Sequence, residues 1–64
     1  MIIVGKKGIF RELILEDSHS IYPYYDGQVA EIIEFHETTK YAEIKIRFED
    51  GFELTITEDE FELI

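Results

Sequence analysis

The chain has 64 residues, no cysteine and a formal net charge of −9. These properties argue against a multidomain protein, a disulfide-stabilised secreted domain and an ordinary nucleic-acid-binding protein. Its length allows one domain, residues 1–64, and a hydrophobic content of 45% is enough for a packed core. Because no disulfide can support so small a domain, we expect a fold held by packing alone in a reducing cytoplasm.

The first segment, residues 1–4, is apolar, but Gly5 ends it and two lysines follow. A signal peptide places its positive charge before a longer apolar stretch, so we interpret this segment as a first strand. No apolar run in the sequence is long enough to cross a membrane. We therefore expect a cytoplasmic protein without a membrane partner.

Two further segments precede the middle of the chain. Residues 9–15 are rich in branched apolar side chains and are predicted to form a strand. Residues 16–26 are polar and aromatic, and Pro23 removes a backbone donor there and favours extended geometry at Tyr22. This second segment is therefore predicted to be a long loop.

The next segment, residues 28–37, has two interpretations. Its apolar spacing includes four positions that fit a helical period: Val29, Ile32, Ile33 and His36. Gly27 before it and the β-branched residues within it favour a strand with a bulge near Ile32 and Ile33. We prefer the strand, and a helix over residues 28–37 in an α+β fold is the alternative.

The clearest pattern covers residues 41–56. Apolar and polar residues alternate on both sides of Asp50-Gly51, which is the signature of a β-hairpin. Residues 57–60 then have the Thr-x-x-Glu spacing of a capping box, which predicts one 3₁₀ turn. A short last strand is predicted to follow, with Phe61 and Leu63 facing the core.

Two stretches resemble SH3-like β-barrels of the KOW and Tudor type. Residues 27–32, GQVAEI, resemble the G-x-V-x-x-I start of the second strand in those domains, and residues 48–51, FEDG, resemble their F-x-D-G turn. The resemblance covers residues 9–64. It implies an all-β fold, a small five-stranded barrel with one 3₁₀ turn before the last strand. Such domains include binding modules and small stand-alone bacterial or prophage proteins.

The serines, histidines and acids of the chain lack the arrangement that catalysis and metal binding need. Ser18 and Ser20 flank His19 in one loop, where no base can be held rigidly against a hydroxyl nucleophile. His19 and His36 lie beside acids, but their spacing is not that of metal ligands. We therefore expect no enzyme, no metal site and no cofactor.

Tyrosines form the first candidate contact surface. Tyr22, Tyr24 and Tyr25 lie together in the long loop, and Tyr41 begins the predicted hairpin. Exposed tyrosines suit protein interfaces, and a neighbouring acid such as Asp26 would favour a cationic ligand. The alternative role for these rings is to cap the open end of a small barrel.

Acidic residues near the C-terminus form the second candidate surface: Glu49, Asp50, Glu53, Glu58, Asp59, Glu60 and Glu62. Such a surface repels phosphate backbones, so ordinary nucleic-acid binding is disfavoured. It suits docking on a basic protein patch, or imitation of a phosphate backbone, or simple solubility.

These patterns together predict a non-catalytic protein-interaction module or small accessory protein. Its partner would be a protein with a basic or cationic patch, bound through the aromatic loop and the acidic surface. The alternative function is an acidic mimic of nucleic acid that inhibits a nucleic-acid-binding protein.

Overall fold

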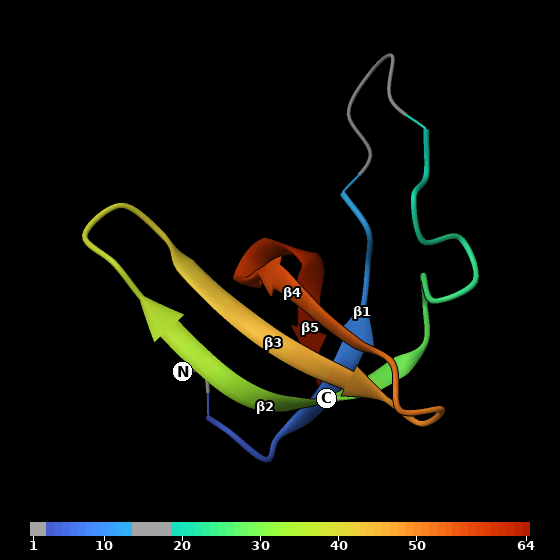
Figure 1. The fold of residues 1–64 in the computed structure, drawn as a ribbon, viewed down its shortest axis with the longest axis horizontal. Helices are drawn as coiled ribbons and strands as arrows, with labels where there is room; N and C mark the ends of the chain where they lie inside the picture. Colours follow the sequence, from blue (N-terminus) through green and yellow to red (C-terminus); the bar gives the residue numbers. More distant parts are fainter. Residues whose placement is uncertain (1–2, 14–18) are drawn as a thin grey trace.

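The computed structural model describes residues 3–13 and 19–64 (Figure 1). The elements in chain order are β1 (Lys7–Phe10), β2 (Val29–Glu37), β3 (Ala42–Phe48), β4 (Glu53–Thr57), the 3₁₀ turn η1 (Glu58–Glu60) and β5 (Phe61–Leu63). All strand pairs are antiparallel, and the five strands form one sheet in the order β4-β3-β2-β1-β5. The fold is all-β, as predicted, and β4 and β5 are the two edges of the sheet.

The strand interpretation of residues 28–37 is confirmed, and the alternative helix is wrong. β2 pairs Ile32 with Ile46 of β3 and then Glu34 with Lys45, so Ile33 is a bulge between two regular stretches. The bulge shifts the alternation by one residue, which brings both Ile32 and Phe35 to the core side of the strand. Apolar residues three positions apart therefore share one face without a helix.

The predicted β3–β4 hairpin is confirmed. Ile44, Ile46 and Phe48 are buried along β3, and the charged residues between them are not. Gly51 has a φ of 94°, a left-handed value that a glycine adopts without strain. The Asp50 side chain accepts a hydrogen bond from the backbone N–H of Phe52 at 3.0 Å, which fixes the turn.

The predicted 3₁₀ turn and last strand are also present, with one correction. The Glu60 carboxylate reaches back to the backbone N–H of Thr57 at 3.5 Å, as a capping box requires. Phe61 is buried, but Leu63 is 41% exposed, so its predicted inward position is wrong. Leu63 pairs with Gly8, which has no side chain to cover it, and β5 is an edge strand.

The start of the chain differs from its prediction. Ile3 and Val4 lie outside the strands and are exposed, because the chain turns at Gly5, where φ is 96°. β1 begins earlier than predicted, at Lys7, and ends at Phe10. Residues 1–2 and 14–15 of the two predicted strands lie outside the described residues.

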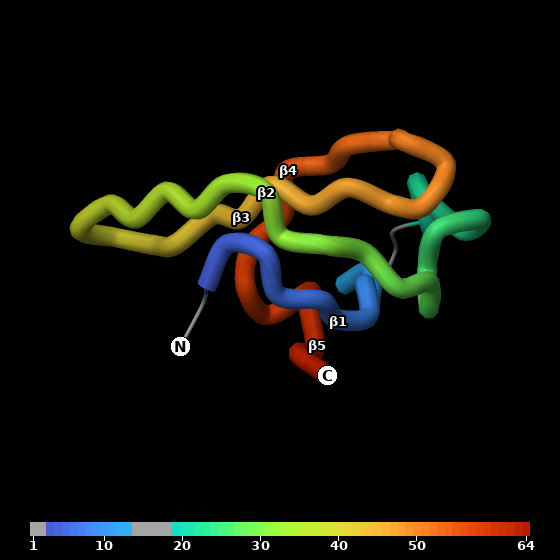
Figure 2. The backbone as a smooth tube through the Cα atoms, turned by 90° about the horizontal axis from the view of Figure 1, so that it is seen from below, coloured from blue at the N-terminus to red at the C-terminus, as the bar shows by residue number. Residues whose placement is uncertain are grey.

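The core lies on one face of the curved sheet and contains these residues: Phe10, Ala30, Ile32, Ile44, Ile46, Phe48, Ile56 and Phe61. Figure 2 shows how the sheet curves, with β4 above β2 and β3 and with β1 and β5 below them. The turn between β2 and β3 projects beyond the rest of the sheet. The part of the chain that the structure describes contains no helix able to span a membrane.

Candidate functional site

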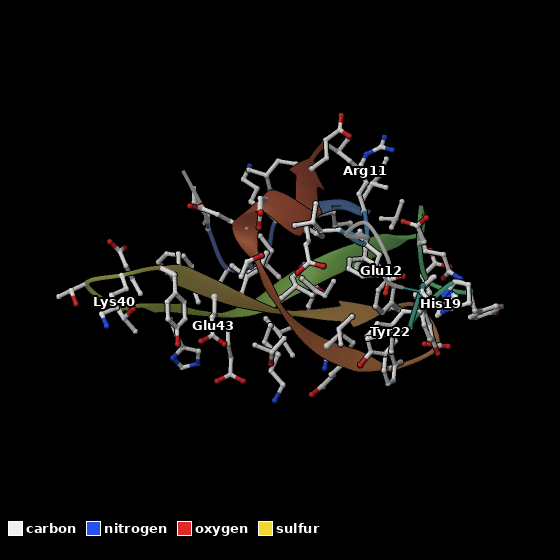
Figure 3. The ribbon with its side chains drawn as sticks, turned by 90° about the horizontal axis from the view of Figure 1, so that it is seen from above. Arg11, Glu12, His19, Tyr22, Lys40 and Glu43 are labelled. Atoms are coloured by element: carbon white, nitrogen blue, oxygen red, sulfur yellow. The ribbon has the colours of Figure 1, made fainter. Side chains whose placement is uncertain are left out.

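The structure separates the four tyrosines of the predicted contact surface. Tyr22 and Tyr25 pack near the turn between β3 and β4, where Tyr25 bonds to Asp50. Tyr41 immediately precedes β3, next to Lys40, and Figure 3 shows Lys40 and Tyr22 at opposite ends of the molecule. The tyrosines therefore belong to two surfaces.

Tyr25 is held between the loop and the sheet. Its ring stacks on Phe52, with centroids 4.6 Å apart and planes 18° apart, and lies 4.5 Å from Phe48. Its hydroxyl donates a hydrogen bond of 2.7 Å to Asp50 Oδ2. The backbone N–H of Phe52 and this hydroxyl lower the pKa of Asp50, and the bond to Asp50 raises the pKa of Tyr25.

Tyr22 also covers the core. Its ring lies 6.5 Å from that of Phe10, edge-on, and 6.0 Å from that of Phe52. Tyr22 and Tyr25 therefore cap one end of the core, the alternative role that the sequence left open. Tyr24 is different, because it is 71% exposed and contacts Tyr25 in a T-shaped arrangement, at a centroid distance of 4.9 Å. It is the outward-facing ring of the loop.

A carboxylate that the sequence did not single out organises this loop. Glu12 accepts hydrogen bonds from the hydroxyl of Ser20 and from the backbone N–H groups of Ile21, at 2.7 Å, and Tyr22, at 3.3 Å. These donors, the Ser20 hydroxyl first, lower the pKa of Glu12. Asp26 in turn accepts from the backbone N–H of Glu12 at 3.0 Å. Asp26 therefore holds the two ends of the loop together.

Several residues of the predicted acidic surface form ion pairs or hydrogen bonds with neighbouring residues. Glu62 pairs with Arg11 at 2.5 Å, and Glu53 lies 3.5 Å from Lys45. Glu60 accepts from the backbone N–H of Leu13 at 3.3 Å. The exposed acids of the turns are a smaller set: Glu49, Asp50, Glu58 and Asp59.

Three basic residues of the strands lie opposite acids of neighbouring strands: Lys7, Lys45 and Arg47. The strand registers set Lys7 opposite Glu31, Glu31 opposite Arg47 and Arg47 opposite Glu53. Opposite charges on facing strands support this register. The strands contain six acids and three bases, so the negative excess is shared between the strands, the turns and η1.

An open hollow of about 520 Å³ brings one tyrosine to the acidic turn η1. It is lined by Leu13, Tyr41, Ala42, Thr57, Glu58 and Asp59. Leu13 is 57% exposed and Tyr41 is 53% exposed, so both present apolar surface to the hollow. The sequence singled out Tyr41, Glu58 and Asp59 but not their proximity.

Local hydrogen bonds hold both sides of this hollow. The Thr38 hydroxyl accepts from the backbone N–H of Tyr41 at 3.2 Å, and the Thr38 N–H donates to the Tyr41 carbonyl at 2.9 Å. On the other side, Arg11 N–H donates to the Glu60 carbonyl at 2.8 Å, which brings Leu13 towards η1. These hydrogen bonds fix the backbone on both sides of the hollow.

The histidines do not form a metal centre with other described residues. His19 is exposed, and His36 Nε2 lies 3.5 Å from Glu34 Oε1. Among residues 3–13 and 19–64, no three His, Cys, Asp or Glu side chains are arranged to hold a metal ion.

Comparison of the chain with protein-family models, with curated proteins and with solved structures gives no significant match. The hollow beside η1 combines concavity, aromatic surface and charge of one sign, and these are the features that recognition of a cationic group needs.

Proposed function

We propose that this protein is a non-catalytic protein-interaction module that binds a lysine- or arginine-bearing segment of a partner protein in the hollow beside η1. The observation that supports this proposal is that Tyr41 and Leu13 line the same hollow as the acidic residues Glu58 and Asp59. The alkyl stem of lysine or arginine packs on apolar surface while its charged end stays near solvent. The hollow offers a surface for both parts.

We also infer that the fold is an SH3-like barrel whose sheet is open at β4 and β5. The five strands in chain order, with a 3₁₀ turn before β5, support this inference, because the sequence resemblance implies that layout. In this class, the long first loop and neighbouring strand ends form the usual recognition surface. Leu13 and Tyr41 lie at such positions.

The expected affinity is modest. A cation over an exposed tyrosine ring contributes about 0.5–1 kcal/mol, and an exposed ion pair contributes about 0.2–1 kcal/mol. A single cationic side chain would therefore bind weakly, and further contacts along the partner would add to it. Such weak recognition is typical of small interaction modules rather than of enzymes.

The proposal is tested by titrating the ¹⁵N-labelled protein with a blocked peptide that has one arginine among glycines and serines. We expect amide shifts at the hollow, near Leu13, Tyr41 and Thr57. Tyr41→Ala should weaken binding about twofold to fivefold, the loss of one exposed cation–π contact. The matched control is Tyr24→Ala, which removes an exposed ring from the other end and should leave the affinity unchanged.

Other results would point elsewhere. Shifts centred on Tyr24 and Asp26 would transfer the binding surface to the aromatic loop, and no binding of a cationic peptide would contradict the proposal. The nucleic-acid mimic, the second function suited to an acidic chain, is tested with a basic DNA-binding protein in place of the peptide. Its binding should weaken by orders of magnitude between low and moderate salt.

A further inference from the structure

β4 has one strand partner among the described residues, which is β3. The backbone N–H of Phe48 donates to the carbonyl of Phe52 at 2.9 Å, so this pair is of the hydrogen-bonded kind. Hydrogen-bonded and non-bonded pairs alternate along an antiparallel ladder. The register pairs Ile46 with Leu54 and Ile44 with Ile56. These pairs lie two and four positions along β3 from Phe48, so they are also of the hydrogen-bonded kind.

The other residues of β4 consequently direct their backbone groups away from β3. They are Glu53, Thr55 and Thr57, which are opposite Arg47, Lys45 and Glu43 in the non-bonded pairs. The Thr57 N–H agrees with this assignment, because the Glu60 carboxylate accepts from it. The N–H and C=O groups of Glu53 and Thr55 therefore lie along the outer edge of the sheet. Figure 2 shows β4 at the upper side of the sheet.

β4 has few of the features that usually protect an edge strand. Proteins block such edges with proline, with bulges or with charged side chains, lysine above all, and β4 has one charged residue, Glu53. β4 has the sequence ELTIT, its register with β3 is regular, and its two threonines are β-branched and exposed. The outer edge of β4 is therefore suited to pair with a further strand.

Charge decides which strand it accepts. The edge is flanked by Glu49 and Asp50 before β4 and by Glu58 and Asp59 after it, all exposed. A second copy of this chain, with its net charge of −9, would bring the same acids against them. A segment with basic residues at both ends would be attracted instead.

We infer that the outer edge of β4 binds an extended segment of a partner protein as an added strand, with lysine or arginine at both ends of that segment. Strand addition obtains affinity from main-chain hydrogen bonds and specificity from the flanking side chains. A strand advances about 3.4 Å per residue, so basic residues about six positions apart would reach both acidic ends of this five-residue strand. This contact extends the proposed function, and Glu58 and Asp59 border both surfaces.

The probe is a blocked heptapeptide with lysine at each end and alternating valine and threonine between them. We expect its addition to slow hydrogen exchange at the amides of Glu53 and Thr55. Thr55→Pro removes the outward N–H and leaves the β3–β4 hydrogen bonds intact, and it should weaken binding about tenfold or more. Thr55→Val, the matched control, keeps the N–H and should bind within about twofold of the parent protein.

A second peptide keeps the test independent of protein folding. The same heptapeptide, N-methylated at every residue between the lysines so that neither edge has an N–H donor there, should fail to bind. A peptide ending in glutamates should also fail.

The inference is overturned if Thr55→Pro binds as tightly as Thr55→Val, or if the heptapeptide does not protect the Glu53 and Thr55 amides. It is also overturned if those amides become protected as the protein alone is concentrated, because a second copy would then occupy the edge.

Tyr41→Ala distinguishes the two proposals. This substitution should weaken the binding of the arginine peptide in the hollow. It should not change how strongly the heptapeptide protects the Thr55 amide from hydrogen exchange.

Discussion

At the scale of single residues, two carboxylates connect the long loop to the sheet. Glu12 accepts from Ser20 and from two backbone N–H groups, and Asp50 accepts from Tyr25, 25 positions earlier in the chain. Each carboxylate is a stronger acceptor when it is ionised, so each interaction depends on pH. The loop is therefore positioned by charge-assisted hydrogen bonds as well as by the packing of Tyr22 and Tyr25.

The first prediction concerns Tyr25→Phe. The ring can keep its stack on Phe52, but the bond from the hydroxyl to Asp50 is lost. The pKa of Asp50 should rise towards its ordinary value of 3.8, and the urea midpoint of unfolding should fall slightly. Carboxyl-carbon NMR titration measures the first effect. Tyr24→Phe is the control, and an unchanged Asp50 titration in Tyr25→Phe would refute the assigned contact.

The second prediction concerns pH and Glu12. Its pKa in the folded state lies below the ordinary value of 4.5, so its contribution to stability is present above pH 4.5. That contribution is lost as the pH falls through the lower folded-state pKa. Glu12→Gln should therefore be less stable than the parent near neutral pH and should lose less stability on acidification. Urea unfolding between pH 3 and pH 6 measures this, with Glu37→Gln as an exposed control. If the free energy of unfolding falls equally with pH in Glu12→Gln and in the parent, the prediction is contradicted.

At the scale of elements, the pairing of β1 with β5 depends on a close approach at Gly8. A Cβ at this position would lie 2.5 Å from the Glu62 carbonyl oxygen and 2.5 Å from the Phe61 ring. Phe61 is the buried residue of β5, and it packs over the backbone of β1. Gly8 thus allows a three-residue edge strand to bury one large side chain.

The third prediction is that Gly8→Ala destabilises the protein by about 1–3 kcal/mol, the usual cost of an overpacked position. The free energy of unfolding in urea measures the effect. In a protein that already has Phe61→Leu, Gly8→Ala should lower the free energy of unfolding by less, because the side chain nearest to the new Cβ is then smaller. Equal costs in the two backgrounds would show that the ring does not limit the space at Gly8.

At the scale of the whole molecule, charge repulsion opposes folding. Fifteen acidic and six basic residues lie on a domain whose Cα radius of gyration is 11.5 Å. The ion pairs on the sheet face are exposed and stabilise little individually. Long-range repulsion among the remaining acids acts against them, and it exceeds the attraction because the acids outnumber the bases.

The fourth prediction follows from this imbalance. Added sodium chloride should raise the melting temperature, because the screening length falls from about 30 Å at 0.01 M to about 3 Å at 1 M. Glu49→Lys should raise the melting temperature at low salt and reduce its dependence on salt. Thermal unfolding followed by circular dichroism measures both. A melting temperature that falls with salt would mean that the ion pairs outweigh the repulsion.

The sequence by itself determined the elements that depend on neighbouring residues. The β3–β4 hairpin follows from two-residue alternation around Asp50-Gly51, and η1 follows from the spacing of Thr57 and Glu60. In both cases the interacting groups are a few positions apart. Local geometry therefore decides the structure before any distant segment is in place.

Tertiary structure decided the rest. In β2 the helical spacing of apolar residues was ambiguous, and pairing with β3 resolved it by placing a bulge at Ile33. The tyrosines formed one group in the sequence, but strand order placed Tyr41 beside η1 and Tyr25 beside Asp50. These positions depend on strand pairing and packing between residues far apart in the chain, which alternation and turn propensity do not encode.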